Sequence, residues 1–261
     1  MKKLTFIAGI IFMMSACSTP EKKNETVQED KKEEAVSIKI EKAPASPEYG
    51  DAVLTLVEPY SEKAGTEDSV SFDFSLTAYE LGVQTDGADT RGIANSGKGQ
   101  HIHLIVNNGP YSAHYDPKFK KKMEPGNYTI LAFLSRSYHE SVKNPNAFAT
   151  KQLTVGDVTP ENVDFSAPHL FYSRPKGTYK GEDTKKLLLD FYLLNTKLSK
   201  DGNKVKATIN GEEFMIDEWA PYYITGAPVG ELTVSLELVD KDGNYIDGPF
   251  NKVTRKVTLE N

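Results

Sequence analysis

The stretch GQHIHLIVNNGPYSAHY, residues 99–115, contains three of the five histidines of this 261-residue chain. His101 and His103 are separated by one residue, so on a β-strand their imidazoles project from the same face. Their Cα atoms would lie about 6.5 to 7 Å apart, a spacing that suits Zn²⁺ or Cu²⁺. His114 or His139 is the candidate third ligand. These four histidines support a first hypothesis, a metal site.

The segment SRSYHES, residues 135–141, supports a second hypothesis, an anion site. Arg136 offers a planar guanidinium, and the serines of this segment offer hydroxyl groups. Together with the histidines, these donors suit a phosphate, a carboxylate or a phosphorylated peptide. Across both hypotheses, the predicted ligand-binding residues are His101, His103, His114, Tyr115, Arg136, Ser137, Tyr138 and His139.

A third hypothesis makes these side chains a solvated hydrogen-bond network on a spacer or adhesion module that docks another envelope protein. The sequence has no GxSxG, HExxH, Walker or glycine-rich phosphate motif. Asp73 and Asp190 each precede a phenylalanine within a predicted strand, and we expect them to pair with neighbouring side chains. The sequence therefore predicts a binding protein that is not an enzyme.

The N-terminus has the features of an export signal. Residues 1–16 contain two lysines, an apolar run and then two small residues, and Cys17 follows at once. The letters MSAC at residues 14–17 resemble a bacterial lipobox, which makes Cys17, the only cysteine, the predicted lipidation site. Ser18, not Asp, follows it, and the resemblance to the usual lipoprotein sorting rule implies an outer-membrane lipoprotein whose folded part lies on the periplasmic or the cell-surface side.

Residues 17–49 consist mainly of charged and other polar residues, and they are predicted to form a disordered tether. Charges of both signs mix in this segment, and the net charge of the whole chain is −6. This balance argues against a nucleic-acid partner, and membrane contact is expected through the lipid alone.

The rest of the chain is an internal repeat. VSFDFSLTAYEL at residues 70–81 aligns with LLLDFYLLNTKL at residues 187–198, and four further segments align in the same order. Each copy is a series of short alternating apolar runs separated by Gly, Pro, Asn and Asp turns. The predicted fold is therefore all-β, with two tandem immunoglobulin-like antiparallel β-sandwich domains at residues 50–156 and 164–261.

The repeat also predicts which way the histidines face. Ile102, Leu104 and Val106 align with apolar residues of the second copy and are expected to face the core. His101 and His103 then project from the opposite face, where the second copy carries lysines. Because lysine is almost never fully buried, we expect this face to be open to water or to a partner.

Two further positions follow from the alignment. His114 aligns with Glu218, and the exchange of histidines for a Lys and Glu set predicts that His114 lies near the histidine pair. Trp219, the sole tryptophan, aligns with Tyr115 and is interpreted as a core or rim aromatic.

At GQHIHLIVN, AHYDPKF, EPGNYTILAFL and SYHE, the first copy resembles an uncharacterised family of histidine-containing immunoglobulin-like domains of exported bacterial lipoproteins. The resemblance covers the first copy, with the second as a degenerate partner. It implies the fold, export and a site at His101, His103, His114 and His139, and it implies no particular ligand. The family's triple histidine appears here as His-Ile-His.

Overall fold

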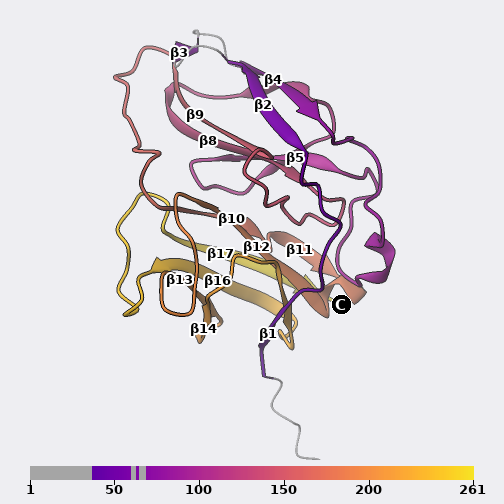
Figure 1. Ribbon diagram of the computed structural model, residues 1–261. Helices are drawn as coiled ribbons and strands as arrows, with labels where there is room; N and C mark the ends of the chain where they lie inside the picture. Colours follow the sequence, from indigo (N-terminus) through magenta and orange to yellow (C-terminus); the bar gives the residue numbers. More distant parts are fainter. Residues whose placement is uncertain (1–36, 60–62, 65–68) are drawn as a thin grey trace, which may run out of the picture. The chain divides into compact units, whose positions relative to one another are not determined.

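The computed structural model describes residues 37–59, 63–64 and 69–261, which form one compact unit (Figure 1). These residues contain β-strands and two short 3-10 helices, η1 (Ala88–Thr90) and η2 (Gly181–Thr184), and no α-helix. No helix in this part of the chain has the length and apolar character needed to cross a membrane. The predicted signal peptide, Cys17 and residues 18–36 of the predicted tether lie outside the described residues.

The first half of the unit is a two-sheet sandwich. Its strands are β2 (Val53–Glu58), β3 (Lys63–Ala64), β4 (Ser69–Thr77), β5 (His101–Val106), β6 (Ser112–His114), β7 (Lys118–Lys122), β8 (Gly126–Ser135) and β9 (Phe148–Val155). One sheet has the order β2-β4-β7 and the other β3-β9-β8-β5-β6. Neighbouring strands are antiparallel, except that β3 pairs with β9 in parallel.

The second half is also a sandwich. Its strands are β10 (His169–Arg174), β11 (Gly177–Lys180), β12 (Lys186–Leu194), β13 (Lys204–Ile209), β14 (Glu212–Ile216), β15 (Tyr222–Thr225), β16 (Gly230–Val239) and β17 (Lys252–Glu260), joined by β1 (Lys39–Lys42). The sheet orders are β1-β15-β12-β10 and β11-β17-β16-β13-β14. Apart from β1, this order repeats that of the first sandwich, strand for strand. The predicted all-β fold class of antiparallel sandwiches is confirmed.

Each sandwich has its own apolar core. Phe72, Ile102 and Leu104 belong to the core of the first, and Leu189 and Val205 belong to the core of the second. Alternate residues of β5 and of β13 therefore point into the two cores, as the period-two pattern predicts.

A third apolar cluster joins the two sandwiches. Ile105, Leu131 and Phe133 project from the outer face of β5 and β8, and Phe171 and Tyr192 project from β10 and β12 to meet them. Figure 1 shows β10 and β12 on the side of the second sandwich that lies next to the first. Burying a side chain of this size contributes about 1.5 to 3 kcal/mol, so this cluster is a substantial part of the fold.

The sequence difference between the copies explains why these faces are buried. Leu131 and Phe133 on the outer face of β8 align with Ser235 and Glu237 on β16. Tyr192 on β12 similarly takes the place of a serine on β4. Each copy thus has apolar residues on one outer face where the other copy has polar ones, and the two apolar faces cover each other.

Asn108 connects the two sandwiches through buried hydrogen bonds. It lies in the turn after β5 with a left-handed backbone, φ 52°. Its amide nitrogen donates to the carbonyls of Leu170 and Phe250, each at 3.0 Å, and its amide oxygen accepts from the backbone N–H of Tyr172 at 2.9 Å. One side chain therefore satisfies three buried backbone groups of the other sandwich.

The prediction of a disordered tether over residues 17–49 is wrong for residues 37–49. β1 pairs with β15 in an antiparallel ladder, and Ile38 is buried in the second core. The apolar residues Ile38 and Ile40 alternate with polar ones, a strand pattern that the overall polar composition of the segment obscured. By pairing with β15, the segment also covers a sheet edge that would otherwise be open.

The repeated aspartates give a matched test of the contact between the sandwiches. Asp190 is buried and binds Lys143 and Ser141 of the first sandwich, whereas its repeat counterpart Asp73 pairs at 2.7 Å with the exposed Lys118. We expect Asp190→Ala to lower the free energy of unfolding by about 3 kcal/mol, because it removes the buried carboxylate that pairs with Lys143 and accepts from Ser141. Asp73→Ala should cost less than about 1 kcal/mol. Urea unfolding of both variants checks this, and equal losses would contradict it.

Candidate metal-binding site

Three histidines meet where the two sandwiches join. His101 and His103 lie on β5, and His139 lies in the turn after β8. One ring nitrogen of each lies within 4.8 Å of the other two, and among the described residues this is the one such group of three metal-ligating side chains. His101 and His103 have 0% of their surface exposed, and His139 is half-buried.

The ring contacts indicate which nitrogens converge. His101 Nε2 lies 2.8 Å from His103 Nε2 and 3.1 Å from His139 Nδ1. His101 Nδ1 lies 2.8 Å from the Gly99 carbonyl, to which it donates, so its Nε2 carries the free lone pair. On the far side of His103, Nδ1 lies 3.4 Å from the Ser173 hydroxyl.

The turn that carries His139 is held from several sides. Its backbone is left-handed, φ 69°, which is uncommon for a residue other than glycine and costs energy unless the surroundings impose it. Its N–H donates to the Arg136 carbonyl, and the Arg136 N–H donates to the Glu140 carbonyl, each at 2.9 Å. Arg136 also forms a buried ion pair with Glu140 at 3.1 Å. These contacts fix the ring opposite β5.

Aromatic and cationic groups surround the histidines. Tyr111 stacks on His103 with ring centroids 3.4 Å apart, and its hydroxyl lies 3.3 Å from His139 Nδ1. On the Tyr111 ring lie the ammonium of Lys176, 4.0 Å from the centroid, and the guanidinium of Arg174 at 5.3 Å. Burial lowers the pKa of Lys176 to about 8, and Arg174 adds to this effect.

The imidazoles are held in their neutral form. Burial lowers the pKa of His101 to about 4, and it lowers the pKa of His103 well below its usual range. The pKa of His139 is also lowered, first by burial and then by the charge of Arg174. Neutral imidazole is the form that binds a metal ion.

The expectation that the histidine face of β5 is open to water is wrong. His101 and His103 do project away from the core of their own sandwich, as predicted. That face is covered by the second sandwich, which contributes Ser173 and Arg174. The exposed lysines at the aligned positions of the second copy were a poor guide to these histidines. In the second copy, no sheet packs on the equivalent face among the described residues, so Lys206 stays in contact with water.

His114 does not join the cluster. It pairs in register with Ile102, so it lies on the core side of the sheet, opposite to its predicted position. Its ring stacks on Phe119 with centroids 3.4 Å apart, and its Nε2 lies 2.8 Å from the Ser112 hydroxyl. Packing next to the core, together with the charge of Lys121, lowers its pKa to about 4.

The contacts of Arg136 speak against the anion hypothesis. Its guanidinium donates to the carbonyls of Pro47 and Ser141 and pairs with Glu140. The hydroxyl of Ser137 accepts from the backbone N–H of Thr85. These groups hold the turn together and are already engaged by protein partners.

The tyrosines of the predicted site have different surroundings. Tyr115 borders the cluster, with its ring centroid 5.0 Å from that of His101. Tyr138 is fully buried away from the cluster, beneath the guanidinium of Arg91. Sequence reasoning missed Tyr111 and Arg174 as neighbours of the histidines. The Arg174 position carried no local signal, because it comes from the other copy of the repeat.

No protein-family model and no curated protein sequence matches this chain. Among solved structures, fibronectin(III)-like modules of Clostridium thermocellum CbhA align over 80% of this chain and 94% of theirs, with 14% identity and a TM-score of 0.28. The central fibronectin-III array of RIM-binding protein aligns over 84% and 69%, with 10% identity and a TM-score of 0.26. Bacteroides ovatus SGBP-B, solved with a mixed-linkage heptasaccharide, aligns over 79% and 47%, with 11% identity and a TM-score of 0.25. At these TM-scores, the likenesses carry no inference about a ligand or a function.

The buried histidines predict a loss of stability in mild acid. In the unfolded chain they take up protons near the ordinary pKa of 6.5, whereas folded His101 stays neutral down to about pH 4. Acid therefore favours the unfolded state, by about 1 kcal/mol for each such histidine between about pH 6.5 and about pH 5.5. Urea unfolding at a series of pH values measures the slope. His103→Gln should reduce it, and an unchanged slope in that variant would refute the prediction.

Proposed function

We propose that this chain is a lipid-anchored, non-enzymatic protein of the cell envelope that binds a transition-metal ion, Zn²⁺ or Cu²⁺. The proposed ligands are His101 Nε2, His103 Nε2 and His139 Nδ1. The observation that carries the proposal is the convergence of the three histidines from two separate elements, with one ring nitrogen of each within 4.8 Å of the other two.

The ring nitrogens that are not proposed as ligands support this assignment. A metal-binding histidine usually donates its second ring N–H to a carbonyl or another acceptor, which fixes the tautomer. His101 has the Gly99 carbonyl in this position, and His103 has the Ser173 hydroxyl. Nitrogens around a tetrahedral zinc lie roughly 3.3 to 3.5 Å apart, so the pairs at 2.8 and 3.1 Å must open by a few tenths of an ångström, and the remaining pair, within 4.8 Å, must adopt the same spacing.

Positive charge near the site opposes the proposed ion. Lys176 and Arg174 lie against the Tyr111 ring and repel any cation at the histidines. The Tyr111 hydroxyl, 3.3 Å from His139 Nδ1, is placed to approach a fourth coordination position. Three histidines with an open position are a common arrangement for zinc and copper.

Metal binding is tested by adding Zn²⁺ or Cu²⁺ to metal-free protein. An ion at about 100 times its Kd should raise the free energy of unfolding by about 2.7 kcal/mol. His103→Ala and His139→Ala should abolish this gain, because each removes one ligand. His114→Ala is the matched control and should keep it.

Lys176→Met separates a cation site from an anion site. Loss of the ammonium should strengthen metal binding several-fold, whereas an anion would bind more weakly. Calorimetric titration of the variant gives both affinities. If neither ion stabilises the protein, the histidines form a structural hydrogen-bond network, and the chain is a spacer or docking module.

The lipid anchor rests on the MSAC sequence at residues 14–17. Cells that make the protein should incorporate radioactive palmitate into it, and Cys17→Ser should abolish this label because the thiol is the acylation site. The variant should also leave the membrane fraction. Labelling that persists without Cys17 would place the lipid elsewhere, and a wild-type chain without label would contradict the anchor.

A further inference from the structure

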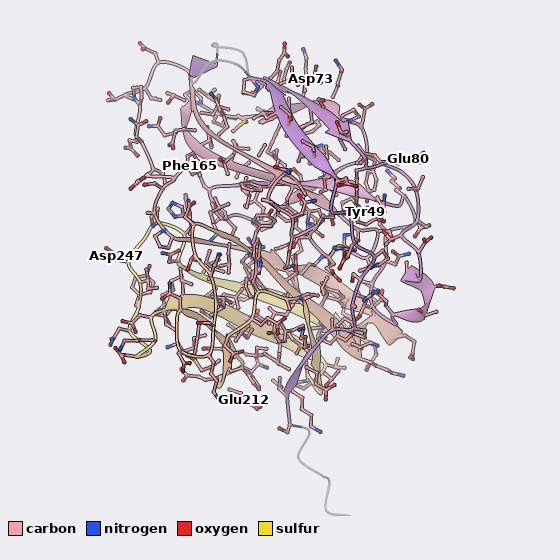
Figure 2. The ribbon with its side chains drawn as sticks, in the orientation of Figure 1. Tyr49, Asp73, Glu80, Phe165, Glu212 and Asp247 are labelled. Carbon is pink, nitrogen blue, oxygen red and sulfur yellow. The ribbon has the colours of Figure 1, made fainter. Side chains whose placement is uncertain are left out.

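A second candidate site lies at the junction of the two sandwiches, in a cleft of about 610 Å³. It is lined by Lys143, Asn144, Pro145, Phe148, Thr150, Phe165, Tyr192, Leu193, Leu194, Asn195, Thr196, Lys197 and Trp219. Phe165, which Figure 2 labels, comes from the segment that links the two sandwiches. None of the three histidines lines this cleft. Its volume is in the usual range of small-molecule sites.

Aromatic rings form much of the wall. Tyr192 packs edge to face with Trp219, with ring centroids 5.1 Å apart. Its ring is tilted against that of Phe148, with centroids 5.4 Å apart. Phe148, Phe165 and Trp219 are each half-buried, so part of each side chain stays in contact with solvent. All three pack on the apolar cluster between the sandwiches and leave part of each ring open to the cleft.

The sole tryptophan is held in a fixed orientation. Its Nε1–H donates to the Phe191 carbonyl at 2.9 Å. The polar end of the indole is thereby satisfied within the protein, and the ring is available as a rigid apolar platform. A ligand that stacks here does not have to order this side chain first.

The polar groups of the cleft are amides, hydroxyls and ammonium groups, and part of them bond within the protein: Asn195 donates to the Ala167 carbonyl, and Lys143 pairs with Asp190. The Tyr192 hydroxyl is buried and has no hydrogen-bond partner among the residues that the structure describes. It is closed to solvent, so a molecule in the cleft does not reach it. Lys197 is exposed at the rim, and no carboxylate lines the cleft. A cationic ligand is therefore disfavoured.

We propose that this cleft binds a saccharide, neutral or acidic. A pyranose ring has an apolar face of C–H groups, which packs on an aromatic ring, and an edge of hydroxyl groups, which bond to polar side chains. The cleft combines these features, with aromatic rings at Phe148 and Trp219 and polar groups at Thr150, Asn195 and Lys197. A purely apolar ligand would leave these polar groups unused.

Trp219 makes the test direct, because its fluorescence reports on the cleft alone. The protein is titrated with cellohexaose, maltohexaose, chitohexaose and hexagalacturonate. Saturable change with at least one of them is expected, and Phe165→Ala and Lys197→Ala should each weaken that binding at least fivefold. His139→Ala is the control, and it should bind the saccharide normally even if it has lost a metal ion.

Melting temperatures show whether each variant is folded. A fluorescence response that survives both Phe165→Ala and Lys197→Ala would place the saccharide elsewhere and overturn the proposal. It is equally overturned if none of the four hexasaccharides changes the fluorescence. The outcome is independent of the metal titration, because the two sites share no side chain.

Discussion

The structure depends on the burial of one sheet face from each sandwich against the other. β5 and β8 supply Ile105, Leu131 and Phe133, and β10 and β12 supply Phe171 and Tyr192. This contact sets the rest of the molecule, because both candidate sites lie along it. His101 and His103 are buried because the second sandwich covers them, and the aromatic cleft exists because the two sandwiches meet beside Tyr192. A single copy of the module would have neither feature.

Period-two alternation and the internal repeat were sufficient to predict the fold class and the direction in which His101 and His103 point. They were insufficient to predict whether these rings are buried. A residue on the outer face of a sheet is exposed or buried according to what packs against that face. The signal was present in Leu131 and Phe133, apolar at positions where the second copy has Ser235 and Glu237. An outer face that turns apolar in one copy marks a contact surface.

The third histidine shows a different limit. His114 and His139 were equal candidates from sequence, and strand register separates them: His114 lies opposite Ile102 and so faces the core. His139 reaches the pair through a left-handed turn, and no periodic pattern predicts such a position. From its local sequence, Arg136 likewise looked free to bind an anion. Its acceptors in the structure include the Pro47 carbonyl, which is far away in the sequence. Non-local contacts of this kind are invisible to local spacing.

The ordered segment before β2 has a mechanical consequence. It pairs with β15 through β1, and further along it meets the histidine turn, where Ser46 binds Glu140 and the Pro47 carbonyl accepts from Arg136. If Cys17 carries a lipid, any pull from the membrane enters the folded unit along this segment. Tension would load the β1–β15 ladder before it reached the turn. The ladder would then bear the load first, and the His139 ring would keep its position when the anchor moves.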